Sequence, residues 1–102
     1  MEEEINKLTE LMRSSSESFW VRLRILLKQK NVNPDTTILA ISHEDDKDFE
    51  FGVIVLENGN TIQYGISYLN KPIEEAEITE WNQLNEANYE EITVAQSMLK
   101  NA

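Results

Sequence analysis

The chain has 102 residues, the size of one compact domain, and its 19 acidic and 9 basic residues give a formal net charge of −10. It contains no cysteine, which excludes disulfides, thiolate metal sites and cysteine nucleophiles. No apolar run is long enough to span a bilayer, and the acidic start Met1-Glu2-Glu3-Glu4 is unlike a secretory signal. We therefore expect a soluble cytoplasmic protein with no membrane contact.

The first 30 residues are predicted to form two amphipathic helices. The first covers residues 3–12, where apolar side chains recur at helical spacing, namely Ile5, Leu8, Leu11 and Met12. This N-terminal helix, within residues 1–13, is expected either to be peripheral or to take part in oligomerisation. Ser14, with Glu17 three residues later, has the spacing of a capping box that begins the next helix.

The second helix is predicted from Glu17 to Lys30. Several of its apolar side chains fall on one arc and predict a broad buried face, namely Phe19, Trp20, Leu23, Leu26 and Leu27. Val21 and Ile25 form a second, narrower stripe, which is expected to meet either the N-terminal helix or a second subunit. Pro34 ends the helical region, because proline cannot continue a helix.

The middle of the chain changes from helical spacing to the alternation of strands, which are predicted over residues 36–42, 50–56 and 61–69. Asn58-Gly59 predicts a two-residue type I′ hairpin between the last two. In the register that this turn sets, Val53 faces Tyr64, and one side of the sheet becomes apolar. The predicted face consists of Phe51, Val53, Val55, Ile62, Tyr64 and Ile66.

The last third of the chain is less regular. Residues 73–80 fit either a helix or an extended edge strand. From Trp81 onward apolar residues recur at spacings of three and four, which predicts a closing helix that reaches about residue 100. The expected fold class is α+β, with one domain over residues 1–102. It contains a three-stranded antiparallel β-meander, helices before and after it in the order α-α-β-β-β-α, and all helices packed on one face.

His43 is the only histidine, and it precedes three acids, Glu44, Asp45 and Asp46. Neighbouring side chains at the end of a strand point in different directions, whereas a metal site gathers ligands from separate elements. We therefore expect His43 to be solvated. A match of the nearby acids to a calcium-loop template fails because Gly52 lies one place late. The chain also lacks Walker and GxGxxG loops, so nucleotide binding is not expected. No catalytic residue, cofactor or metal ligand is predicted.

The order of a helix, three antiparallel strands and a helix is also that of double-stranded RNA-binding domains. Those domains contact phosphates through a lysine-rich start of their last helix, whereas residues 85–91 of this chain hold three glutamates and no lysine. We therefore expect no nucleic-acid binding. The basic residues Arg22, Arg24, Lys28 and Lys30 are assigned to a solvated face or to salt bridges with the acidic half.

Charge is distributed unevenly, since residues 35–102 hold fourteen acids and three lysines, whereas residues 1–34 have a net charge of +1. Such a field favours basic partners, although an acidic surface also serves solubility alone. The leading hypothesis is a non-catalytic binding or regulatory protein that docks on a basic protein, as immunity proteins and DNA-mimicking inhibitors do. The expected docking residues are Glu44, Asp45, Asp46, Asp48, Glu74, Glu75, Glu77, Glu80, Glu86, Glu90 and Glu91.

Two alternatives stay open at this point. A small enzyme that uses clustered carboxylates would show a pocket holding two or more acids with shifted pKa values. A structural homo-oligomer would bury Ile5, Leu8 and Met12, or Val21 and Ile25, only across a subunit boundary. Because the two N-terminal helices offer more apolar surface than one small core needs, we expect a homodimer.

Overall fold

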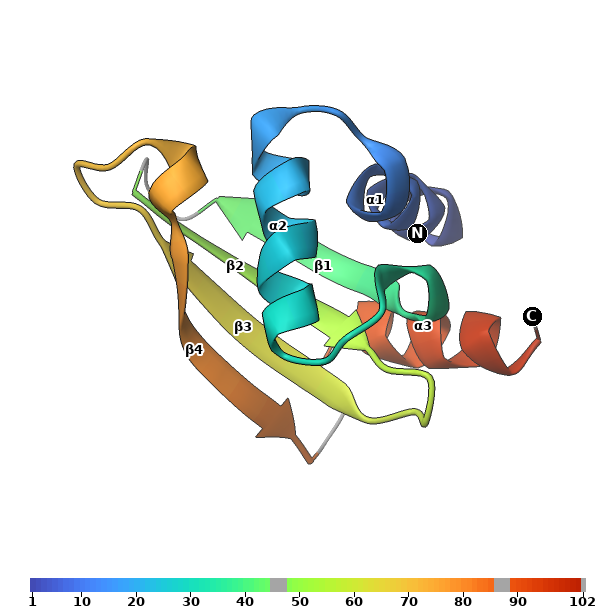
Figure 1. The fold of residues 1–102 in the computed structure, drawn as a ribbon. Coiled ribbons are helices and arrows are strands. Elements are labelled where there is room, and N and C mark those ends of the chain that lie inside the picture. The colour runs from blue at the N-terminus through green and yellow to red at the C-terminus, as the bar shows by residue number, and fades with distance from the viewer. Residues whose placement is uncertain (45–47, 86–88, 102) are drawn as a thin grey trace.

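The computed structural model describes residues 1–44, 48–85 and 89–101. Its elements are α1 (Glu2–Ser14), α2 (Ser18–Gln29), the short 3-10 helix η1 (Pro34–Thr36), β1 (Ile38–Glu44), β2 (Phe49–Val55), β3 (Thr61–Ser67), the 3-10 helix η2 (Ile73–Glu75), β4 (Glu77–Leu84) and α3 (Glu90–Lys100). The α+β class is confirmed: two N-terminal helices precede an antiparallel meander, and a C-terminal helix packs against it (Figure 1). No helix in this part of the chain is long and apolar enough to cross a membrane.

The sheet has four strands in the order β1-β2-β3-β4, one more than predicted. Residues 77–84 form the fourth strand, so the prediction that the closing helix starts at Trp81 is wrong for its first residues. Trp81 pairs with Tyr64 and Ile78 with Ile66, and both β4 side chains are half-buried against the core. This pairing satisfies the free edge of β3, which outweighs the helical spacing of the apolar residues. The helix itself begins at Glu90 and ends at Lys100.

The β2–β3 connection is a three-residue loop, not the two-residue turn predicted. The Leu56 amide donates to the Asn60 carbonyl at 2.8 Å, and the Gly59 amide donates to the Leu56 carbonyl at 2.8 Å. Gly59 has φ +89°, whereas Asn58 lies outside the positive-φ region that a type I′ turn requires at both central residues. The Asn58 side chain instead accepts a hydrogen bond from the Asn60 amide at 2.9 Å.

The extra loop residue shifts the β2–β3 register by one position. Val53 pairs with Gln63, and Tyr64 pairs with Gly52, so the predicted opposition of Val53 and Tyr64 is wrong. Because alternate residues of a strand point to opposite sides, a one-residue shift separates the two apolar series that were expected on one face. Ile54 and Ile62 form a pair on the face that α2 covers, whereas Val53 belongs to the other face.

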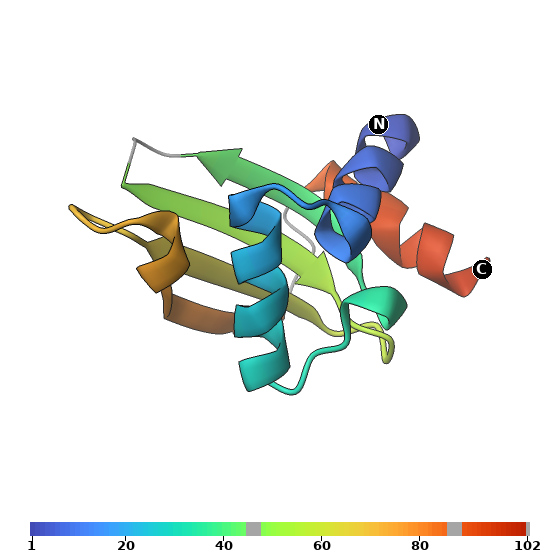
Figure 2. The same ribbon diagram turned by 45° about the horizontal axis from the view of Figure 1, so that its top comes forward.

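Each face of the sheet has its own apolar core, which corrects the expectation of helices on one face only. The core under α2 contains Met12, Trp20, Leu23, Leu26, Leu27, Val32, Leu39, Ile54, Ile62, Tyr64, Ile66 and Ala76. The second core contains Ile5, Ile38, Ala40, Val55 and Ala95, and α3 covers it. Figure 2 shows α2 across one face, with α1 and α3 gathered at the β1 side of the sheet.

Helix α1 is integrated into the domain, because it contributes a buried residue to each core. Ile5 is buried beside Ala95 of α3, and Met12 is buried in the core under α2. Two residues that an oligomer was expected to bury are therefore buried within this chain. Val21 and Ile25, the second stripe of α2, are 38% and 44% exposed.

Two arginine side chains of α2 donate hydrogen bonds to backbone carbonyls of neighbouring segments. The Arg24 guanidinium donates to the carbonyls of Met12 and Ser15, and Arg22 donates to the carbonyl of Ala76 at 2.9 Å. The capping box predicted from Ser14 and Glu17 is absent from this junction: Ser14 bonds back to a carbonyl of its own helix, and α2 starts without a side-chain cap. The arginine contacts take its place in holding the α1–α2 turn.

Candidate functional site

The antiparallel meander brings two acidic connections to the same end of the sheet (Figure 1). Glu44 ends β1 and Asp48 precedes β2 in the first connection, whereas Glu74, Glu75 and Glu77 lie in η2 and at the start of β4 in the second. Five of the eleven predicted docking residues are thus brought to one end. Asp45, Asp46 and Glu86, which were also predicted to dock, lie outside the described residues.

The other three predicted docking residues lie elsewhere. Glu80 pairs with Gly65 in the interior of the β3–β4 ladder. Glu90 and Glu91 form the first turn of α3, which follows the far end of β4. Among the described residues, the predicted acids thus lie at three places in the fold. The set at the β1–β2 and β3–β4 connections is the one considered further.

The same end of the sheet holds an acid that the sequence-based prediction left out. Glu50 on β2 lies opposite Glu44 on β1 and opposite Ile66 on β3, and the pleat turns its side chain toward the α2 face. Burial raises the pKa of Glu50, repulsion from Glu44 adds to the rise, and a side-chain hydrogen bond from Tyr68 opposes both, so that the resulting pKa is about 7. Glu50 therefore titrates near neutral pH, unlike an ordinary surface carboxyl.

Tyr64 ends beside Glu50 with an unsatisfied hydroxyl. Its side chain is 1% exposed, and its Oη has no hydrogen-bond partner within the part of the chain that the structure describes. Burial and the charge of Glu50 raise the pKa of this phenol. The ring lies directly against Gly52, where any Cβ would collide with Tyr64 Oη, so the glycine lets the hydroxyl reach across β2.

The hydroxyl of Tyr68 lies in the same negative field, because the charges of three carboxylates influence its pKa. Burial raises the pKa of Tyr68, and the charges of Glu50, Glu44 and Asp48 raise it further. The Tyr68 amide also donates to the Asp48 carbonyl at 2.9 Å, which holds the chain after β3 next to the β1–β2 connection. We call these residues the acidic cluster: the carboxylates of Glu44, Asp48 and Glu50 with the hydroxyls of Tyr64 and Tyr68.

A metal role finds no support in the described ranges, where no group of three or more histidine, cysteine or acidic side chains could hold an ion. His43 is exposed, as expected for a solvated side chain, and its ring contacts Phe51 with centroids 5.3 Å apart. Since Phe51 and Glu50 are adjacent on β2, His43 lies on the opposite face from the acidic cluster. The histidine and these carboxylates thus do not form one site.

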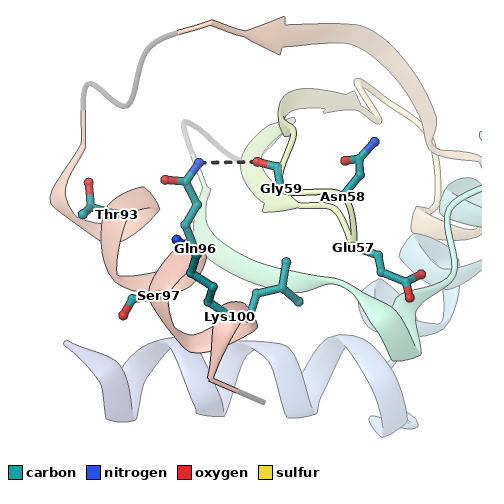
Figure 3. A pocket seen from close by; sticks show the side chains of 8 residues that line it. Glu57, Asn58, Gly59, Thr93, Gln96, Ser97 and Lys100 are labelled. Atoms are coloured by element: carbon teal, nitrogen blue, oxygen red, sulfur yellow. Dashed lines mark hydrogen bonds between the residues drawn. The ribbon is translucent and has the colours of Figure 1, made fainter.

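A separate groove of about 560 Å³ lies between the β2–β3 turn and α3. Figure 3 shows Gln96 of α3 reaching across to the turn, where its amide donates to the Gly59 carbonyl at 3.4 Å. Glu57 and Lys100 are its charged lining residues, and Thr93 and Ser97 supply hydroxyls. The residues that line this groove include no histidine.

No protein-family model, curated protein or solved structure matches this chain. The acidic cluster, which combines a carboxyl that titrates near neutral pH with a buried unpaired hydroxyl, is therefore the feature from which function is inferred.

Proposed function

We propose that this protein is a small, acidic, non-catalytic binding module that docks on a basic protein partner. The docking surface is the end of the sheet that carries the β1–β2 and β3–β4 connections. Its described acids are Glu44, Asp48, Glu50, Glu74, Glu75 and Glu77. The observation that carries the proposal is the opposition of Glu44 and Glu50 across two strands, with the pKa of Glu50 raised to about 7.

Like charges held directly opposite each other on a sheet destabilise the fold, and a surface that needed only solubility would space its acids apart. A cationic side chain at this position would relieve the repulsion between Glu44 and Glu50. Lys71 is the basic residue that the described chain places in the β3–β4 connection, and it is exposed. The field at this end of the sheet is therefore strongly negative and attracts basic partners over about a Debye length.

The test starts with affinity capture from native lysate and identification of bound proteins by mass spectrometry. The association rate of the captured partner is then measured at low and at physiological salt. We expect fast association that slows steeply as salt rises, because steering between opposite charges is screened.

The discriminating variant reverses Glu74, Glu75 and Glu77 to lysine, and its matched control reverses Glu90 and Glu91. The first should slow association at low salt by about tenfold or more, whereas the control should change it far less, because α3 starts away from the acidic end. A partner that is neutral or acidic, or a rate indifferent to salt and to both reversals, would show that the acidity serves only solubility.

A further inference from the structure

We propose that the acidic cluster is the anchoring site for one lysine side chain of the partner, whose ammonium lies between the carboxylates of Glu44 and Glu50. This inference deepens the proposed function and rests on it for the source of the lysine. The chemistry of the site is a property of this chain alone, so it can be tested without the partner.

The geometry of the strands supplies the two carboxylates. Glu44 and Glu50 are directly paired across β1 and β2, and such cross-strand neighbours have Cβ atoms about 5 Å apart on one face of the sheet. Both side chains therefore extend toward the same space. The groups that influence Glu50 are Glu44 and Tyr68, and no cation from the described residues is among them.

The buried hydroxyl of Tyr64 is an independent sign of an incomplete site. It lies beside Glu50 at 1% exposure and without a partner among the residues that the structure places. An ionised Glu50 offers an acceptor to this hydroxyl, while Tyr68 donates to the same carboxylate. A cation that keeps Glu50 ionised therefore keeps a charged, stronger acceptor beside the Tyr64 hydroxyl.

An ammonium fits this set of acceptors better than the other common cations. Its three N–H donors match one oxygen each from Glu44, Glu50 and the Tyr68 hydroxyl, whereas a guanidinium presents a planar fork suited to a single carboxylate. In the described part of the chain, no group of three or more acidic, histidine or cysteine side chains is placed to hold a metal ion. A lysine of the partner is therefore the occupant that the site favours.

Binding is then linked to protonation. The groups that face Glu50 are Glu44 from β1 and the two tyrosines from β3 and the segment after it, so the free site prefers Glu50 protonated at low pH. Because an ammonium binds the ionised form, its affinity should rise as pH increases through about 7.

The experiment follows the side-chain carboxyl ¹³C signal of Glu50 by NMR across a pH titration. The titration is made without ligand and then with the peptide Ac-Gly-Lys-Gly-amide, added until the signals no longer move. A peptide with norleucine in place of lysine is the matched probe, because it keeps the aliphatic chain without the charge. We expect lysine to lower the midpoint of Glu50 by about one pH unit, which corresponds to about tenfold tighter binding to the ionised form, and norleucine to leave it unchanged.

Two variants identify the site. Glu50→Gln, which conserves shape, should abolish peptide-induced shifts at the ring signals of Tyr64 and Tyr68, whereas Glu90→Gln on α3 should preserve them. Equal midpoints with both peptides, or shifts that persist in Glu50→Gln, would overturn the proposal. The proposal would also fail if the lysine peptide shifted these signals only in the Lys47→Gln variant, because the chain's own Lys47 would then be the occupant of the site.

The experiments distinguish failure of the proposed lysine site, the anchor, from failure of the proposed docking surface. If Glu50→Gln leaves partner affinity unchanged while reversal of Glu74, Glu75 and Glu77 still slows association, the anchor is wrong and the docking surface stands. If the lysine peptide binds at Glu50 but the natural partner is indifferent to salt, the site is real and the proposed function is wrong.

Discussion

Glu50 links the stability of the fold to pH. The folded state raises its pKa from 4.5 to about 7, mainly through burial and then through Glu44. Between these two values Glu50 binds more protons in the folded protein than in the unfolded chain, so its contribution to stability is most favourable below about pH 4.5 and is lost as pH rises through about 7. The half-buried carboxyl is partly screened by solvent, and we expect the loss to be on the order of 1 kcal/mol.

Glu50→Gln should therefore raise the free energy of unfolding by about 1 kcal/mol at pH 8 and leave it nearly unchanged at pH 4.5, because only the ionised carboxylate is penalised. Urea unfolding at both pH values measures the effect. Glu77→Gln, at an exposed position on β4, is the control and should show no such difference. Equal gains at both pH values would contradict the assignment of the penalty to ionisation.

Helix α1 acts on the outer edge of the sheet as well as on the cores. The Leu39 amide on β1 points away from β2 and donates to Thr9 Oγ1 of α1 at 3.1 Å, and both residues are buried. An edge strand normally leaves such amides open to pairing with another chain. This contact satisfies one of them, and α1 covers that edge.

Replacing the Thr9 hydroxyl by a methyl group tests this role of α1. Thr9→Val keeps the shape but leaves the buried Leu39 amide without an acceptor, which should cost about 1–3 kcal/mol of stability. Thr93→Val on α3, where the side chain is exposed, is the matched control and should cost under about 0.5 kcal/mol. Chemical denaturation of the two variants compares them, and equal losses would show that the hydrogen bond contributes nothing.

At the scale of the whole molecule, part of the apolar surface on which the expectation of a homodimer rested is buried within the chain itself. Ile5 and Met12 are buried in the chain's own cores, so the apolar surface left for a second copy on the N-terminal helices is mainly the α2 stripe of Val21 and Ile25. We still predict a dimer through this stripe. Sedimentation at several concentrations should give a mass above 11.8 kDa that falls on dilution, and Ile25→Glu should remove the rise. A constant mass of one chain would reject the dimer.

The charge layout of the whole molecule follows from topology as much as from composition. An antiparallel meander returns the end of β1 and the end of β3 to the same side, so acids about thirty residues apart in the sequence come to the same end of the sheet. The same topology sends Glu90 and Glu91 to another part of the molecule. The opposition of Glu44 and Glu50 is local to the β1–β2 hairpin, whereas the strand order is what brings Glu74 and Glu75 to the same end.

The sequence by itself determined the helices, the first three strands and the acidic character, because these depend on spacing and composition within short windows. The buried faces of α1 and α2 and the helix that ends near residue 100 were predictable from a period of 3.6 residues. Asn58-Gly59 correctly indicated a hairpin. Local signals identify such elements because neighbouring residues alone decide them.

Only the tertiary structure decided the register, the fourth strand and the site. Turns of two and three residues at Asn58-Gly59 are both compatible with the local sequence, and the choice between them depends on contacts across strands, such as Tyr64 against Gly52. A shift of one residue moves every side chain to the other face, so that choice also decided that Glu50 lies beside Tyr64 and Tyr68. The pKa of Glu50 depends on burial and on partners from other strands, and these exist only once the sheet has formed.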